Sequence, residues 1–213
     1  MGIFSKTMCV VGVTLFIGLS GCSQKQIGKP VGKDPGVAIS CIGVMPVQPS
    51  AENANGISYA QAKQLKDGAA VMDALIKKKL AGRRAFRFAN SAQAYTIDVG
   101  SNPAARLQKV AEQLSCNAML DITLNRYTDR LGGEYTSKNP ASVAFHYKLY
   151  DMNQGKVLCL GRFDEKQQSL MENLYNWNRA SKRGFTWVTS EELLMEGIHE
   201  KFSECAYLAD PES

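Results

Sequence analysis

The amino-acid sequence predicts an α/β fold: one domain with a mixed sheet and flanking helices, preceded by a signal peptide and a tether. Two features of the chain carry this prediction. Short apolar or alternating segments, typical of strands, are separated by longer segments whose apolar residues recur at helical spacing. The chain after residue 21 is also long enough to bury a sizeable core in one domain, and it contains no internal repeat.

The expected order of elements is strand, helix, strand, helix, three strands, helix. Pro46 ends the first strand, Gly82 follows the first helix, and Pro103 lies in the first turn of the second helix. The elements expected in this first part are a strand within 39–47, a helix at 59–80, a strand at 85–89 and a helix at 103–114.

The second part of the chain is richer in expected strands. Gly132 and Gly133 mark a loop that runs to Pro140, and Ser190 is the expected N-cap of the final helix. The expected elements are strands at 118–127, 143–149 and 156–164, a hairpin turn at 151–155, an irregular helix at 165–177 and a final helix at 190–202.

The amino-terminal segment has the layout of a secretory signal. Lys6 supplies a positive charge, and the apolar run that follows is too short to span a membrane as a permanent helix. The run ends in Leu19-Ser20-Gly21-Cys22, which is typical of a bacterial lipoprotein box. Residues 1–21 are therefore the expected lipoprotein signal peptide, and Cys22 would carry the acyl chains, two or more of which anchor a protein stably. An ordinary signal peptide that leaves Cys22 unmodified is the alternative.

Residues 22–36 are predicted to form a flexible tether, and residues 37–208 an α/β periplasmic domain. The tether segment is basic, contains glycine and proline, and has no apolar periodicity. Ser23 follows the box cysteine. The box resembles those of bacterial lipoproteins that follow a sorting rule. Under that rule, aspartate at this position retains a protein in the inner membrane. Ser23 therefore favours the outer membrane, with the domain on the periplasmic face.

Three stretches resemble a group of small periplasmic lipoprotein domains. Ile42–Val47 is similar to their first strand, Ala111–Leu120 to their passage from helix to strand, and Leu149–Leu158 to their hairpin. The group includes the curli secretion-channel lipoprotein, the outer-membrane lipoprotein activators of penicillin-binding proteins and the amino-terminal domain of the Tol–Pal propeller protein. The chain departs from the usual Gly-Ala-Asp at Ser115-Cys116-Asn117. The resemblance covers roughly residues 37–164 and implies a fold rather than a reaction.

The domain has four cysteines, with no C-x-x-C pair to suggest a zinc cluster. An oxidising periplasm permits disulfides, and we expect at most one or two. Cys159 alternates with leucines inside a strand, so we expect it to be a reduced core residue. Cys41 and Cys116 each precede a strand, and Cys205 ends the last helix, so Cys205 is expected to bridge to one of those two.

No residue pattern predicts catalysis, a metal site or a cofactor. His146 and His199 are isolated, and Asp151 to Gly155 lacks the ligands of a calcium loop. The chain contains no G-x-S-x-G, H-E-x-x-H or P-loop sequence. The formal net charge of +5 is too mild to indicate nucleic-acid binding, and secretion makes such a partner improbable.

Tyr135, Tyr175 and Trp177 are the residues expected to bind a partner. They are large amphipathic side chains in the otherwise polar segments Asp129–Pro140 and Glu165–Trp187. Both segments follow strands expected to run in the same direction, so both should lie at the end of the sheet away from Cys41, Cys116 and Cys205. The alternative is that the aromatic side chains cover the open face of the sheet.

Two interpretations of function follow. The first is a non-enzymatic, lipid-anchored docking or assembly factor for an envelope or cell-wall machine, with an envelope protein or peptidoglycan as its partner. The second is a periplasmic enzyme acting on cell-wall or envelope material, which convergent acids near His146 would favour. The basic stretch from Lys77 to Arg87 is typical of a solvated helix C-terminus, with contact to anionic lipid headgroups or peptidoglycan as the alternative.

The lipoprotein box predicts that Cys22→Ala abolishes lipidation, because the thiol that accepts the diacylglycerol is removed. Metabolic labelling with a fatty acid and membrane fractionation measure the effect. Normal labelling of the variant would show that Cys22 is not the acylated residue.

Overall fold

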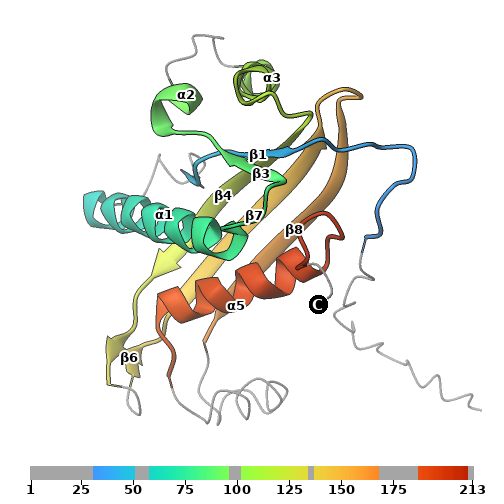
Figure 1. Ribbon diagram of the computed structural model, residues 1–213. Helices are drawn as coiled ribbons and strands as arrows, with labels where there is room; N and C mark the ends of the chain where they lie inside the picture. The colour runs from blue at the N-terminus through green and yellow to red at the C-terminus, as the bar shows by residue number, and fades with distance from the viewer. Residues whose placement is uncertain (1–30, 51–57, 96–101, 134–136, 168–186, 211–213) are drawn as a thin grey trace, which may run out of the picture.

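A mixed, six-stranded sheet forms the centre of the molecule (Figure 1). The computed structural model describes residues 31–50, 58–95, 102–133, 137–167 and 187–210. The strand order is β3-β1-β4-β7-β8, and β2 pairs with β4 off this path. The strands are β1 (Ile42–Val44), β2 (Gln48–Pro49), β3 (Phe86–Phe88), β4 (Ala118–Thr128), β7 (Ser142–Asp151) and β8 (Lys156–Lys166).

The sheet is parallel on one side and antiparallel on the other. β1 runs parallel to β3 and β4, whereas β4, β7 and β8 form an antiparallel meander of long strands. β1, β3, β4 and β8 therefore begin at one end of the sheet, which we call the proximal end. The opposite end, where β4 and β8 finish, is the distal end.

The described helices are α1 (Tyr59–Leu80), α2 (Ser91–Tyr95), α3 (Pro103–Leu114) and α5 (Ser190–Ser203). Of these, α1, α3 and α5 begin and end close to the residues expected from the sequence, whereas the short helix α2 was not expected. Ser58 and Gln61 form a capping box on α1, and Asn102 caps α3 just before its proline. The predicted cap of α5 was wrong by one residue. Thr189 is the N-cap and forms a capping box with Glu192.

A small hairpin lies where the sequence predicted only a loop. It pairs β5 (Leu131–Gly132) with β6 (Ser137–Asn139) in a separate two-stranded sheet. Strands of two and three residues leave too little alternation to be detected in a sequence. None of the helices in the described ranges is long and apolar enough to span a bilayer.

Helices α1 and α5 both pack on the same face of the sheet, which we call the covered face (Figure 1). The strand side chains that point into this layer are almost completely buried, and so are their partners on the helices. The main contributors from the strands are Leu120, Ile122, Leu124, Phe145, Tyr147, Leu149 and Phe163. Burial of this apolar layer is the main source of the stability of the fold.

The approach of α5 to the sheet depends on two glycines. A Cβ at Gly197 would lie 2.7 Å from the ring of Phe163, and a Cβ at Gly161 would lie 2.4 Å from the ring of Tyr147. The space left at Gly161 is filled by the Tyr147 ring, whose hydroxyl donates a hydrogen bond of 2.8 Å to the carbonyl of Lys201. The sheet and the helix are thus joined at close range near the proximal end.

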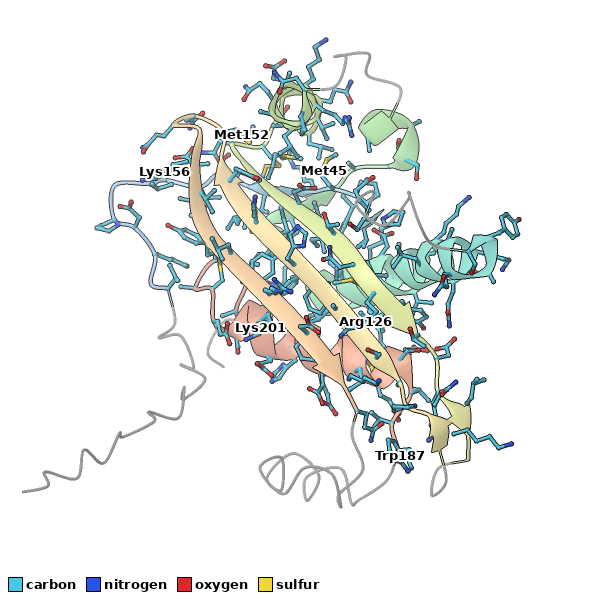
Figure 2. All side chains as sticks on the ribbon, turned by 180° about the vertical axis from the view of Figure 1, so that it is seen from behind. Met45, Arg126, Met152, Lys156, Trp187 and Lys201 are labelled. Atoms are coloured by element: carbon cyan, nitrogen blue, oxygen red, sulfur yellow. A yellow bond between two sulfur atoms is a disulfide. The ribbon has the colours of Figure 1, made fainter. Side chains whose placement is uncertain are left out.

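The opposite face of the sheet is covered only in part. Helices α2 and α3 bury a second, smaller core that includes Met45, Val110 and Met119. On this opposite face, none of the described helices other than α2 and α3 lies over β4, β7 and β8 (Figure 2). We call this uncovered area the open face. Leu160, which is 65% exposed, lies on it.

The amino-terminal segment joins the domain at the proximal end. Val31 forms a parallel β-bridge with Cys205. The carboxylate of Asp34 pairs with Lys156 at 2.8 Å, and the backbone N–H of Asp34 donates to the Tyr207 hydroxyl.

Two disulfides are present, and one corrects a sequence-based expectation. Cys41 bonds to Cys116, whose Cα atoms are 4.9 Å apart at the starts of the neighbouring strands β1 and β4. Cys159 was expected to be reduced, with Cys205 bonded to Cys41 or Cys116, and this was wrong. Cys159 is buried as expected, but it bonds to Cys205. Its side chain lies on the covered face, and α5 ends over β8, whereas Cys41 and Cys116 directly precede β1 and β4, farther across the sheet.

The disulfide between Cys159 and Cys205 closes a long loop, so its loss should lower the free energy of unfolding by about 2–4 kcal/mol. We expect this from the double variant Cys159→Ala/Cys205→Ala in denaturant unfolding. The matched double variant Cys41→Ala/Cys116→Ala tests the other bridge. Peptide mapping without reductant should recover both pairs, and a peptide joining Cys205 to Cys116 would contradict the assignment.

Candidate functional site

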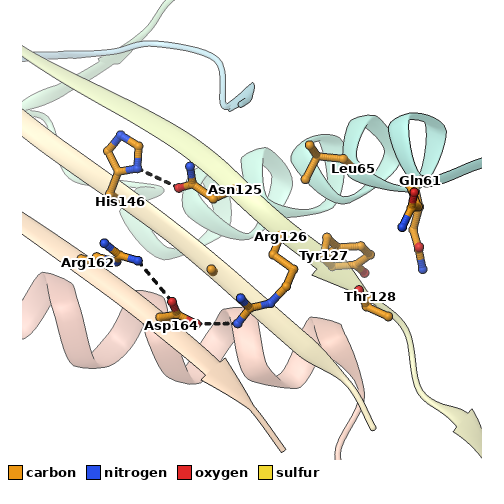
Figure 3. Close-up of a pocket in the computed structure, with 11 residues that line it drawn as sticks. Gln61, Leu65, Asn125, Arg126, Tyr127, Thr128, His146, Arg162 and Asp164 are labelled. Atoms are coloured by element: carbon orange, nitrogen blue, oxygen red, sulfur yellow. Dashed lines mark hydrogen bonds and ion pairs between the residues drawn. The ribbon is translucent and has the colours of Figure 1, made fainter. Parts of the chain in front are cut away.

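A groove lies at the distal part of the sheet, between the end of β4, the open face and the first turns of α1 (Figure 3). It has a volume of about 580 Å³. Its walls are polar and charged, with few apolar side chains. The lining residues are Gln61, Gln64, Leu65, Asn125, Arg126, Tyr127, Thr128, Ala144, His146, Arg162 and Asp164.

A β-bulge in β4 determines which side chains face the groove. Leu124 pairs with Phe145 and Arg126 with Ala144, so Asn125 is an extra residue on β4. A bulge of this kind places two successive side chains on the same side of the sheet. Asn125 and Arg126 therefore both lie on the open face, and Tyr127 turns to the covered face, where it contacts the backbone of Gly68.

The bulge brings Arg126 into an ion-pair network across three strands. Its Nε donates a hydrogen bond of 2.6 Å to the Ser142 hydroxyl, and its Nη2 lies 2.5 Å from Oδ1 of Asp164. Arg162 pairs with the other carboxylate oxygen of Asp164 at 3.3 Å. Burial raises the pKa of Asp164, but the two guanidinium groups outweigh that effect and hold the pKa below its usual value. Two arginines thus share one carboxylate, which leaves the groove with excess positive charge.

His146 lies beside this network on β7. Its Nδ1 is 2.8 Å from Oδ1 of Asn125, so the amide oxygen accepts from the Nδ1–H tautomer (Figure 3). Two acids share its face of the sheet, Asp121 on β4 and Asp164 on β8. His146 makes no hydrogen bond to either of them among the described contacts. No serine or cysteine is among the described residues that line the groove.

Asp121 is an acid whose protonation is affected by the fold. It lies on β4 opposite Lys148. Burial raises its pKa above the ordinary value of 3.8, against the opposing charges of His146, Lys148 and Arg106. A perturbed carboxyl group of this kind can mark a functional site, and it can equally be a half-buried structural residue.

The three residues predicted to bind a partner, Tyr135, Tyr175 and Trp177, lie outside the described residues. The described residues that flank them do meet at the distal end. The Arg130 guanidinium donates to the carbonyl of Trp187, and the Ser190 hydroxyl donates to the carboxylate of Asp129. The part of the chain after β4 and the part before α5 are therefore adjacent, next to the groove.

The groove was not predicted from the sequence. Arg126, Arg162 and Asp164 come from two strands and meet only through the pairing of both with β7. A simple alternation along β4 would place Arg126 on the covered face. No cluster of metal-binding side chains is found within the ranges that the structure covers.

Comparisons with known proteins give only distant similarities. No protein-family model and no curated protein matches the chain. Its sequence resemblance to the periplasmic lipoprotein group therefore stays a prediction at the level of sequence. Solved structures with a related arrangement of elements do exist.

A PelC dodecamer from Paraburkholderia phytofirmans is 11% identical, with a TM-score of 0.45, over 80% of this chain and 89% of the PelC chain. The C-terminal domain of LpoB from Escherichia coli is 12% identical, with a TM-score of 0.34, over 63% of this chain and 88% of that domain. The lipoprotein GNA1162 from Neisseria meningitidis is 16% identical, with a TM-score of 0.33, over 68% and 93% of the respective chains. Similarities at this level do not assign a function.

The raised pKa of Asp121 predicts how stability changes with pH. Because the folded state disfavours the ionised carboxyl group, the penalty grows as the pH rises through the ordinary value of 3.8. Asp121→Asn should therefore unfold at a higher denaturant concentration than the natural protein at neutral pH. The difference should shrink as both proteins are moved to pH values below 3.8.

Denaturant titrations at several pH values measure this difference. Asp164→Asn serves as the contrast, because the pKa of Asp164 is lowered and its loss should destabilise the protein at neutral pH. An Asp121→Asn variant that is less stable at neutral pH would mean that the charges of Lys148 and Arg106 outweigh burial.

Proposed function

We propose that this protein is a lipid-anchored outer-membrane protein on the periplasmic face, and that it acts as a docking or assembly factor for an envelope or cell-wall machine. The lipoprotein box at Cys22 would supply the anchor. The docking site would be the distal groove, and Tyr135, Tyr175 and Trp177 are the predicted aromatic contact residues. An acidic or polar segment of an envelope protein is the partner that the groove favours.

The observation that carries this proposal is the pair of arginines on one carboxylate in an open groove. Arg162 has a side chain that is 76% exposed, and Arg126 is 40% exposed, so both guanidinium groups can reach a partner. Arginine is well suited to this role because its planar group binds carboxylates through two parallel hydrogen bonds. Leu160 adds an exposed apolar contact on the same strand as Arg162.

The chemistry of the groove supports binding more than catalysis. Asp164 is held ionised by two arginines, and a carboxylate in that state is a poor proton donor near neutral pH. The described partner of His146 is an amide oxygen, which does not stabilise an imidazolium as a carboxylate does. The alternative, a periplasmic enzyme, rests on Asp121, which has a raised pKa and lies on the same face of the sheet as His146.

Photo-crosslinking in intact cells tests the docking face. A photoreactive residue in place of Leu160 on the open face should crosslink to a partner of defined mass, whereas the same residue in place of Ala74 on the outer side of α1 should not. Arg162→Glu should reduce the crosslink at position 160 several-fold, because it reverses an exposed charge beside the probe. Lys63→Glu, an exposed change on α1, is the matched control.

Trp177→Ala extends the test to the predicted aromatic contact. It should weaken the same crosslink while the midpoint of thermal unfolding stays nearly unchanged. If the variant instead loses about 3–5 kcal/mol of stability, Trp177 belongs to the core and is not a contact residue. Equal crosslinking from positions 160 and 74, unaffected by Arg162→Glu, would refute the docking face.

A further inference from the structure

We propose that the proximal end of the domain rests on an anionic phospholipid surface, so that the domain has a fixed orientation on the membrane with its distal groove directed away from it. The inference rests on the lipid anchor of the proposed function. It adds the face of the domain that contacts the membrane and the chemistry of that contact. Three features of the molecule support this orientation: the reach of the chain, the place where it joins the domain, and the charge found there.

The chain between the anchor and the domain is short. Val31 follows Cys22 by nine positions, and a fully extended chain advances at most about 3.3–3.6 Å per residue. Val31 is therefore never more than about 32 Å from the acylated cysteine. The strand β8, with eleven residues, is about 35 Å long at the usual rise per residue. The anchor thus restrains the domain to a distance shorter than the length of its own sheet.

The chain joins the domain at the proximal end and is held there by several contacts. Val31 forms backbone hydrogen bonds with the strand-like segment after α5, through its N–H to the carbonyl of Glu204 and its carbonyl to the N–H of Ala206. The ion pair of Asp34 with Lys156 adds a contact at the start of β8. Farther along, the side-chain amide of Asn117 binds the carbonyl of Ala38 at the start of β4. The segment therefore crosses the proximal end from β8 to β4 (Figure 2).

The basic stretch from Lys77 to Arg87, which runs from the last turn of α1 into β3, also lies at the proximal end. The end of α1 contacts the C-terminal segment next to Cys205, where Lys79 pairs with Asp210 and Arg83 donates to the carbonyls of Leu208 and Ala209. These contacts place the basic stretch beside the point where the amino-terminal segment joins. They also show that part of its charge has a structural role.

The remaining cations of the stretch are not neutralised within the described residues. Lys77 pairs with Asp73, but Lys78 and Arg84 are exposed and have no carboxylate within ion-pair distance among the described side chains. Arg87 is exposed and binds only the carbonyl of Leu114. A helix dipole accounts for lysines in the last turn of α1, but Arg84 and Arg87 lie beyond the end of the helix.

On the covered face, the distal end carries acids where the proximal end carries cations, whereas the two arginines of the groove lie on the open face. The N-terminus of α5 lies at the distal end and exposes Glu191 and Glu192, which suit the positive end of the helix dipole. An anionic surface would attract Lys78 and Arg84 and repel these two acids. Charge and reach therefore favour the same orientation, with the proximal end on the membrane.

Lysine labelling on reconstituted vesicles tests this orientation with the full-length, lipidated protein. We would place it in vesicles of phosphatidylcholine alone or of phosphatidylcholine with phosphatidylglycerol, acetylate it briefly, and measure each lysine by mass spectrometry. Lys33 and Lys78 should react several-fold more slowly when phosphatidylglycerol is present, and high salt should remove the difference. Lys138 and Lys166, which are exposed toward the distal end, should react at the same rate on both vesicles.

A charge-reversal pair identifies the residues that make the contact. Lys78→Glu/Arg84→Glu should restore fast labelling of Lys33 on the anionic vesicles, whereas Lys138→Glu/Lys166→Glu should leave its protection unchanged. Equal labelling of Lys33 and Lys78 on both vesicles, or protection of Lys138 and Lys166 instead, would overturn the proposal. Failure of the lipid anchor is a separate result, because an unacylated protein would not float with the neutral vesicles at all.

Discussion

The packing of α1 and α5 on a single face of the β4–β7–β8 meander is the constraint on which the rest of the structure depends. Tyr147 is its central contact, because its ring fills the space above Gly161 and its hydroxyl binds the end of α5. The Cys159–Cys205 bond joins the same two elements covalently. With both long helices on one face, only short helices remain for the other, so much of that face must consist of side chains that tolerate water.

The order of the longer elements and most of their boundaries could be predicted from the sequence, because they depend on local patterns. Apolar spacing, a proline and a glycine define α1 and α3 without reference to the rest of the chain. The candidate site could not be predicted in this way. It depends on a one-residue bulge at Asn125, which reverses the direction of Arg126, and on partners from two strands. The disulfide of Cys159 was missed for a related reason, since the strand on which a helix ends is decided by packing.

The two functional proposals concern opposite ends of one sheet. At the distal end, Arg130 and Asp129 bond to Trp187 and Ser190, so the chain after β4 is held to the chain before α5. The proximal end is held by the two disulfides and by the amino-terminal segment. A domain that is stiff at the membrane side and presents its open face beyond it would hold a partner at a defined height and direction, which a long, loose linker would not do.

The position of α5 in the chain also bears on how the protein is made. The chain is synthesised from its amino-terminus, and α5 begins only at Ser190, after β4, β7 and β8. The meander of β4, β7 and β8 can pair earlier, but Phe145, Tyr147 and Phe163 have no helix to cover them until α5 arrives. This aromatic surface therefore stays in contact with water, and with any other apolar surface nearby, until α5 has been made and packs on the sheet.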